Sequence, residues 1–356
     1  MVGMERIRNR KGREPGAQRA GLRPVRMLFF LAAILLVIFL LSFSIGRYGV
    51  PADQVLRILF SRIFHLPIAE TWTPEMETVV INIRLPRILL ACLVGCSLSA
   101  AGASYQGVFQ NPMAAPDILG ASSGAAFGAA LAILFGAASG MITLSAFLFS
   151  MITVLAVFLI AQRAPGARVV NLILAGIMIS SLFTAGTSYI KLVADPTNQL
   201  PQITYWLMGS LSGARLRDIG FVALPLALGL VPLLLLRWQI NILTLGDEEA
   251  RTLGINTNRL RLIVIVCSTL VTAASVSVSG MIGWVGLVIP HLCRKLVGSN
   301  YRYLMPATYL GGAAFLLLVD NLSRNLLAVE IPIGILTAFI GAPFFIYLIC
   351  RREKTL

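Results

Sequence analysis

The chain has 356 residues, of which 57% are hydrophobic and only 12% are charged, and its mean hydropathy is +0.85. Soluble domains carry about 25% charged residues, so this composition excludes an ordinary soluble protein. A spanning helix needs about 20 mostly apolar residues, so the chain has room for about ten. The net charge of +14 comes from Lys and Arg that flank apolar runs, which indicates membrane topology rather than nucleic-acid binding.

The N-terminal part predicts a basic arm followed by a first membrane span. Residues 1–26 contain many Lys and Arg and no apolar run, whereas Met27–Ile45 is continuously apolar. Its length favours a retained span over a cleaved signal peptide. Lys and Arg favour the cytoplasmic side, so the arm predicts a cytoplasmic N-terminus. The connection Arg47–Arg87 is polar, and Val55–Phe64 within it has the period of a short surface helix.

Nine further apolar runs predict nine further spans. Their expected bounds are Ile88–Phe109, Ile118–Ala138, Met141–Ala161, Val169–Ile190, Ile219–Leu236, Leu260–Ser279, Gly280–Val297, Tyr303–Leu322 and Pro332–Cys350. Between them, Lys191–Asp218 is interrupted by prolines and favours a re-entrant or surface helix. Ten spans place both termini inside, and most Lys and Arg then lie on the inner side. The sequence thus predicts an all-α polytopic membrane protein with one transmembrane domain, residues 27–350, and a cytoplasmic tail, 351–356.

Small residues recur every four positions in two of the predicted spans. In the third span they form a face against which another helix can pack closely, made of Gly120, Gly124 and Gly128. In the fifth span they form a narrow polar stripe, made of Gly176, Ser180, Thr184 and Ser188. From the residues alone, this stripe fits helix packing and the wall of a transport pathway equally well.

Enzymatic and metal-binding motifs are absent from the sequence. There is no GxxxxGK[ST] phosphate loop and no HExxH, and the five cysteines sit in or beside apolar runs without partner ligands. We therefore expect no catalytic residue, no cofactor and no metal site. No pair of acidic residues lies within a span, which disfavours a proton- or sodium-driven carrier. Asp320 lies four residues before Arg324, as in a local ion pair.

Each predicted face offers one candidate for partner binding. On the outer face, Arg84, Arg87 and Arg324 lie at the ends of apolar helices. They suit docking of an acidic partner, although simple interfacial snorkelling explains them as well. On the inner face, Gly246–Gly254 predicts a short amphipathic helix that fits a groove on a cytoplasmic protein, or else a solvated connector.

Several ordered motifs together resemble the FecCD family of bacterial ABC importer permeases. The motifs are Arg84-Leu-Pro-Arg87, the turn from Gln106 to Gly120, the segment Gly246–Gly254, the run from Gly283 to His291, and Ile331-Pro-Ile-Gly334 with Gly341-Ala-Pro343. The resemblance covers about residues 27–350. It implies a fold like that of the cobalamin importer permease, and a complex of two permease subunits (here expected to be a homodimer), two cytoplasmic ATPase subunits and an extracytoplasmic binding protein.

The resemblance also implies roles for residues. It assigns binding-protein docking to Arg84, Arg87 and Arg324. It assigns a cytoplasmic gate to Asn111, Pro112, Met113, Gly166 and Ala167. It favours the pathway interpretation of Gly176, Ser180, Thr184 and Ser188. It assigns coupling to the ATPase to a segment of about residues 239–258, within it Gly246, Asp247, Glu248, Glu249, Arg251, Leu253 and Gly254.

The function expected from this resemblance is transport rather than catalysis. The chain would import an iron-siderophore or similar metal chelate across the cell membrane by alternating access, with ATP hydrolysed on separate subunits. Haem, cobalamin or an oxyanion are alternative cargoes, and a stand-alone secondary carrier is an alternative class of transporter. Because the binding protein selects the cargo first, the permease sequence leaves the substrate open.

Overall fold

The computed structural model describes residues 15–166 and 168–350, and the described residues form helices joined by turns and loops. Residues 1–14 of the predicted basic arm, Ala167 of the predicted gate and the tail 351–356 lie outside the described residues. The helices in chain order are α1 Pro15–Ser44, α2 Ala52–Phe64, α3 Pro74–Glu77, the π-helix η1 Thr78–Arg84, α4 Leu85–Val108, the 3-10 helix η2 Pro116–Leu119, α5 Ala121–Leu134, α6 Ser139–Arg163, α7 Arg168–Val193, α8 Gln199–Met208, α9 Leu216–Leu235, α10 Arg237–Leu243, α11 Asp247–Thr252, α12 Thr257–Ser279, α13 Val285–Val297, α14 Tyr301–Asn325 and α15 Ile333–Cys350.

The all-α polytopic fold predicted from the sequence is confirmed. Seven helices in the described ranges are long and apolar enough to cross a membrane: α1, α4 with its N-terminal extension, α6, α7, α9, α12 and α14. The third, eighth and tenth predicted spans are the shorter helices α5, α13 and α15, of 14, 13 and 18 residues. The predicted ends of the third span are wrong, because Ile118 and Leu119 belong to η2 and α5 stops just before Gly136, whose φ is +67°.

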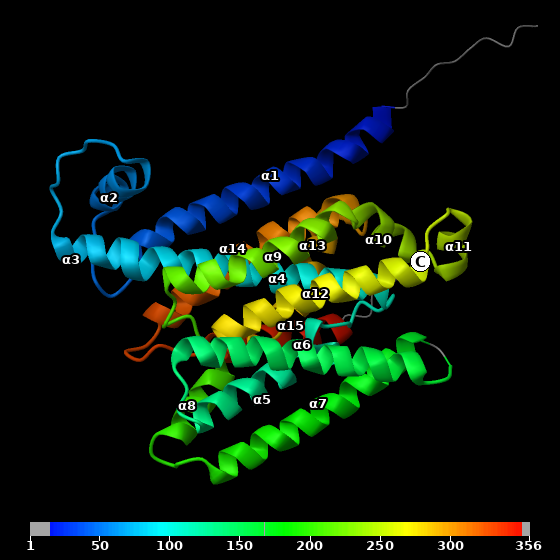
Figure 1. Ribbon diagram of the computed structural model, residues 1–356. Coiled ribbons are helices and arrows are strands. Elements are labelled where there is room, and N and C mark those ends of the chain that lie inside the picture. The colour runs from blue at the N-terminus through cyan, green and yellow to red at the C-terminus, as the bar shows by residue number, and fades with distance from the viewer. Residues whose placement is uncertain (1–14, 167, 351–356) are drawn as a thin grey trace, which may run out of the picture.

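Four helices form a central block, in which α4 packs against α12, α13 and α14 (Figure 1). Their close approach depends on glycine: a Cβ atom added to Gly102 in α4 would lie 1.8 Å from the carbonyl oxygen of Gly286 in α13. A second group, α5, α6 and α7, packs together and joins the block through α12. Helix α7 lies along one edge of the molecule, and α1 lies along the opposite edge (Figure 1).

The segment before α4 is helical further upstream than the sequence predicts. Pro74–Val108 is one continuous helical stretch of 35 residues, because α3, η1 and α4 follow one another without a break. The end of the predicted polar connection Arg47–Arg87 is therefore part of a helix. The predicted surface helix is present as α2, and Arg62 of α2 forms an ion pair of 2.6 Å with Glu77 of α3.

The two ends of the molecule carry different short elements. Helices α2 and α3 lie at one end, hereafter the α2 end, and α11 lies at the opposite end, the α11 end (Figure 1). The interrupted stretch Lys191–Asp218 contains α8, which has 10 residues and is no full span, as predicted. The short helix predicted within Gly246–Gly254 is present as α11, which begins after Gly246 and ends shortly before Gly254, with φ of +130° and +78° at these glycines.

Candidate functional site

A buried charge cluster lies near the α2 end, where α4 meets α14. Arg87 contacts Asp320 at 2.9 Å and Glu330 at 2.9 Å, and Arg324 contacts the second oxygen of Asp320 at 3.2 Å. Because they lie on the face that the sequence predicts to be the outer one, we call Arg87, Asp320, Arg324 and Glu330 the outer charge cluster. The predicted ion pair between Asp320 and Arg324 is present. Both arginines are almost fully buried, at 5% and 7% exposure, so their charges are neutralised within the chain rather than offered to solvent.

Arg84 is buried separately from this cluster. Its guanidinium donates hydrogen bonds to the backbone carbonyl oxygens of Phe43, in α1, and Tyr48, in the following loop. Its side chain therefore holds the end of α1 against η1. Of the three arginines predicted to dock a partner, Arg87 and Arg324 belong to the outer charge cluster and Arg84 does not. All three contact other groups of this chain.

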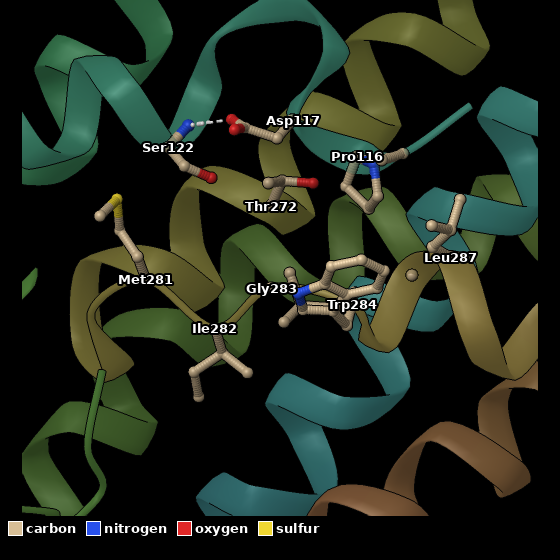
Figure 2. A pocket seen from close by; sticks show the side chains of 12 residues that line it. Pro116, Asp117, Ser122, Thr272, Met281, Ile282, Gly283, Trp284 and Leu287 are labelled. Atoms are coloured by element: carbon tan, nitrogen blue, oxygen red, sulfur yellow. Dashed lines mark hydrogen bonds between the residues drawn. The ribbon is translucent and has the colours of Figure 1, made fainter. Parts of the chain in front are cut away.

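A central cavity of about 250 Å³ lies between η2, the start of α5, α12 and the segment before α13 (Figure 2). Asp117 projects toward it, and one carboxylate oxygen accepts a hydrogen bond of 2.9 Å from the backbone N–H of Ser122, in the first turn of α5. Thr272 of α12 and Trp284 line the same cavity. Trp284 has a φ of +69°, a strained backbone conformation for a bulky residue that persists only where the surrounding structure imposes it.

A second cavity, open and about 560 Å³ in volume, runs along α7. Ser180, Thr184 and Ser188 line it, and so does Asp117, which therefore stands between the two cavities. Gly176 differs from the rest of the predicted stripe: its Cα faces η2 so closely that an added Cβ would lie 2.3 Å from the carbonyl oxygen of Ile118. Three members of the stripe thus face a cavity, and the fourth is a packing position.

The turn after α4 is exposed and tied to α10. Asn111, Pro112 and Met113 are exposed, and the side chain of Asn111 accepts a hydrogen bond from the N–H of Met113. Next to them, Gln110 adopts a positive φ of 49° and donates a 2.7 Å hydrogen bond to the carbonyl oxygen of Leu243 at the end of α10. This hydrogen bond connects the turn directly to the end of α10. Gly166, the other described residue of the predicted gate, is exposed.

Beyond α10, α11 projects at the α11 end. Glu248, Glu249, Arg251 and Leu253 are exposed there, and Asp247 pairs with Arg261 of α12 at 2.8 Å.

The three predicted packing glycines lie at and after the start of α5. Gly124 and Gly128 contact α6 so closely that an added Cβ would lie within about 2.5 Å of α6 atoms, and Gly120 faces Ser180 of α7.

The comparisons with known proteins decide the family. Residues 34–351 match the FecCD transport family. The chain belongs to this family. Among curated relatives, it is 41% identical over 329 residues to the molybdate import system permease MolB of Haemophilus influenzae, covering 92% of this chain and 96% of that protein. It is 38% identical over 342 residues to the hemin transport system permease HmuU of Yersinia pestis, covering 93% and 97%.

Further similarity points to the same class of protein. The chain is 42% identical over 279 residues to a probable iron chelatin transport permease of Helicobacter pylori, covering 78% and 84%. Among solved structures, an inward-facing conformation of a transporter described as metal-chelate type superposes with a TM-score of 0.81 at 40% identity, covering 92% of this chain and 99% of that one. The protein is therefore a multi-pass FecCD-family ABC importer permease without a catalytic domain, and membership of this class implies ATPase and binding-protein partners.

Three residues of these sites, Asp117, Glu330 and Arg261, were not singled out from the sequence. Asp117 follows a proline and precedes a helix, which is a usual place for a capping carboxylate, so nothing in the sequence indicates two cavities beside it. Glu330 and Arg261 are single charges next to apolar runs, and their partners Arg87 and Asp247 lie 243 and 14 residues away. Spacing along a helix does not detect such pairs.

Proposed function

We propose that this permease imports a bulky metal chelate of the iron-siderophore kind, delivered by an extracytoplasmic binding protein. The observation that carries the proposal is the lining of the 560 Å³ cavity along α7. Its polar residues are hydroxyl-bearing, Asp117 is the charged residue among those that line it, and no Lys or Arg of the described chain takes part. Hydroxyl groups and apolar walls tolerate the varied surface of a chelate, whereas a carboxylate without a neighbouring cation repels a small anion.

The direction and partners form part of the same proposal. With both termini inside, the α11 end faces the cytoplasm and the α2 end faces the binding protein, as the distribution of Lys and Arg favours. Two permease subunits, expected as a homodimer, would face each other across the pathway, with the exposed sides of their α7 helices lining it. Two ATPase subunits would contact α11, where Glu248 and Arg251 are exposed.

Alternating access follows from the links between these parts. Closure of the ATPase subunits would shift α11 and α10, and the hydrogen bond from Gln110 to Leu243 would pass that shift to the turn at Asn111–Met113. This turn and the one containing Gly166 would then open or close the cytoplasmic exit. The coupling arises because the ATP-bound and ATP-free complexes hold α11 in different positions, not because the sites communicate over distance alone.

Docking by Arg84, Arg87 and Arg324 requires an exchange of partners in this proposal. Glu330 has the most exposed side chain of the outer charge cluster, at 31%, and lies in the loop before α15. An acidic side chain of the binding protein would displace Glu330 from Arg87, while Asp320 keeps both arginines in place. Replacing Glu330 by Gln should therefore strengthen docking by removing the competitor. Weaker docking of Glu330→Gln would contradict the exchange.

Uptake by the reconstituted complex tests the cargo. Proteoliposomes with the permease, its ATPase and its cognate binding protein would be given ⁵⁵Fe-siderophore or ⁹⁹Mo-molybdate, with and without internal ATP. We expect ATP-dependent iron uptake that exceeds molybdate uptake. Uptake that follows a proton gradient without ATP would instead identify a secondary carrier.

An oxyanion is the second candidate because of the 41% identity to a molybdate import permease. The two cargoes are separated by Asp117→Asn, which removes the negative charge between the cavities and keeps the shape of the side chain. For a chelate importer we expect iron uptake close to that of the unmodified chain. If the variant greatly increases molybdate uptake while iron uptake is negligible in both forms, the oxyanion is the cargo.

A further inference from the structure

A cavity of about 280 Å³ lies near the α11 end, between the last turns of α6 and the first turns of α7 and α12. It is separate from both cavities described above. Its polar lining consists of Gln162 on α6 and of Asn256, Asn258, Arg259 and Arg261 at the start of α12. Two guanidinium groups and three amides surround it, and no acidic side chain of the described residues lines it. Such a set of donors suits an anion.

Arg261 provides an independent sign of a ligand. The side chain is 8% exposed, and its two terminal nitrogens donate to Asp247 at 3.3 and 2.8 Å. Its Nε–H is buried and has no hydrogen-bond partner among the described residues. A buried donor without an acceptor is costly, and a charged one more so. A ligand oxygen in the cavity would satisfy this group.

The electrostatic environment favours negative charge as well. Asp247 compensates Arg261, so Arg259, which is exposed, is the uncompensated cation of the lining. Arg163 follows Gln162 at the end of α6 and adds to the positive field. The cavity also lies at the N-terminus of α12, a helix of 23 residues, where the helix dipole attracts anions.

The apolar surroundings indicate what carries the anion. Phe158, Leu172 and Leu262 form the remaining wall. Next to it, Leu262 and Val266 lie one turn apart on the exposed face of α12, and Leu159 is exposed on α6. An anion on an apolar chain can therefore place its charged group in the cavity and its chain along these helices.

We propose that this cavity binds the phosphate group of an anionic phospholipid from the leaflet on the α11 side. Basic pockets between membrane helices hold such headgroups. The phosphate oxygens accept from Nε of Arg261 and from Arg259, and the acyl chains lie against α6 and α12. Since Arg261 also holds Asp247, at the start of α11, lipid binding fixes the link between α12 and the short helix that projects from this end.

The test measures lipid binding to the full permease with its ATPase subunits, in nanodiscs of neutral phosphatidylcholine containing a titrated fraction of phosphatidylglycerol. Retained phosphatidylglycerol is quantified by native mass spectrometry. We expect Arg259→Gln to weaken phosphatidylglycerol binding about fivefold, the effect of one interfacial cation. Arg302→Gln is the matched control, because Arg302 is exposed in the first turn of α14 and lies outside this cavity. The control should bind like the unmodified chain.

A second variant keeps the charge and fills the space. Gln162→Trp places an indole in the cavity, and we expect it to lose phosphatidylglycerol as Arg259→Gln does. Equal weakening by Arg302→Gln, or normal binding by Gln162→Trp, would overturn the proposal, because attraction would then be general to the surface. If phosphatidylglycerol is retained equally by the unmodified chain and by Arg259→Gln, whereas millimolar inorganic phosphate binds the unmodified chain and not Arg259→Gln, the ligand is free phosphate and the lipid proposal is overturned. These readouts are independent of transport, so they stand apart from the proposed cargo.

Discussion

Helices α12 and α7 are nearly equal in length and apolar character, yet they differ greatly in burial. The most apolar stretch of 18 residues has a mean hydropathy of 2.2 in α12 and 1.9 in α7. In α12, 72% of this stretch is buried inside the protein, whereas in α7 only 17% is buried. Both also bond their serines to their own backbone, as Ser275 does to Val271 and Ser188 to Thr184. Composition therefore identifies a membrane helix, whereas its neighbours decide whether it belongs to a core or to an exposed face.

This difference in burial divides the chain into a tightly packed block and a helix with one open side. The central block of α4, α12, α13 and α14 is fixed by backbone contacts and by the outer charge cluster. Helix α7 leaves one side open, next to the 560 Å³ cavity. Mutations in the central block should then affect folding, and, under the proposed function, mutations on the open side of α7 should affect transport.

The largest effect is expected from Asp320→Ala in α14. This change removes the carboxylate that both Arg87 and Arg324 contact and leaves two buried guanidiniums without it. Breaking a buried ion pair in this way costs about 3–5 kcal/mol. Thermal unfolding of the reconstituted protein would measure the loss. Ser188→Ala on α7 is the control, with an expected change of about 0.5 kcal/mol or less; similar losses in both would erase the contrast between the two regions.

A smaller effect is expected from Gly102→Ala in α4. The added methyl group would lie 1.8 Å from the carbonyl oxygen of Gly286, so α4 and α13 must separate. Overpacking of this kind costs about 1–3 kcal/mol. The paired variant is Ala185→Val on the exposed part of α7, which adds more volume and should leave the unfolding temperature unchanged. A stable Gly102→Ala protein would mean that the central block yields more readily than its packing indicates.

The smallest effect is expected in a test that does not depend on stability. It measures whether water reaches chosen positions on α7 and α12. In a Cys350→Ser background, which removes the exposed cysteine, single cysteines would replace Ser188 of α7 and Ser275 of α12. A membrane-impermeant maleimide should modify the α7 cysteine at least about tenfold faster, because the closed core protects α12. A cysteine at Leu182, which is 65% exposed, tests whether this access is confined to the polar side of α7. Faster reaction at 182 than at 188 would mean that lipid, not water, faces the hydroxyl stripe.

The sequence predicted the existence of the helices better than their ends or their contacts. Long apolar runs with the right period identify α1, α6, α9 and α14 directly. The start of α5 could not be predicted, because Ile118 and Leu119 are as apolar as the helix that follows and only their 3-10 geometry separates them from it. The three arginines predicted to dock a partner stand out in the sequence, but the burial of Arg87 and Arg324 depends on Asp320 and Glu330, whose place beside Arg87 is set by tertiary packing.

The π-helix η1, Thr78–Arg84, interrupts the regular α-helical winding of the stretch Pro74–Val108. A π-helix accommodates a surplus residue inside an otherwise regular helix. Each residue of a regular α-helix turns the chain by about 100°, so a residue deleted from α4 would rotate everything upstream by that amount. A residue deleted between Thr78 and Arg84 would instead remove the surplus and restore α-helical winding with little net rotation. The ion pair between Glu77 and Arg62, which ties α3 to α2, should then survive. The π-helix is thus the part of this stretch that can lose one residue while α2 and α3 keep their orientation relative to α4.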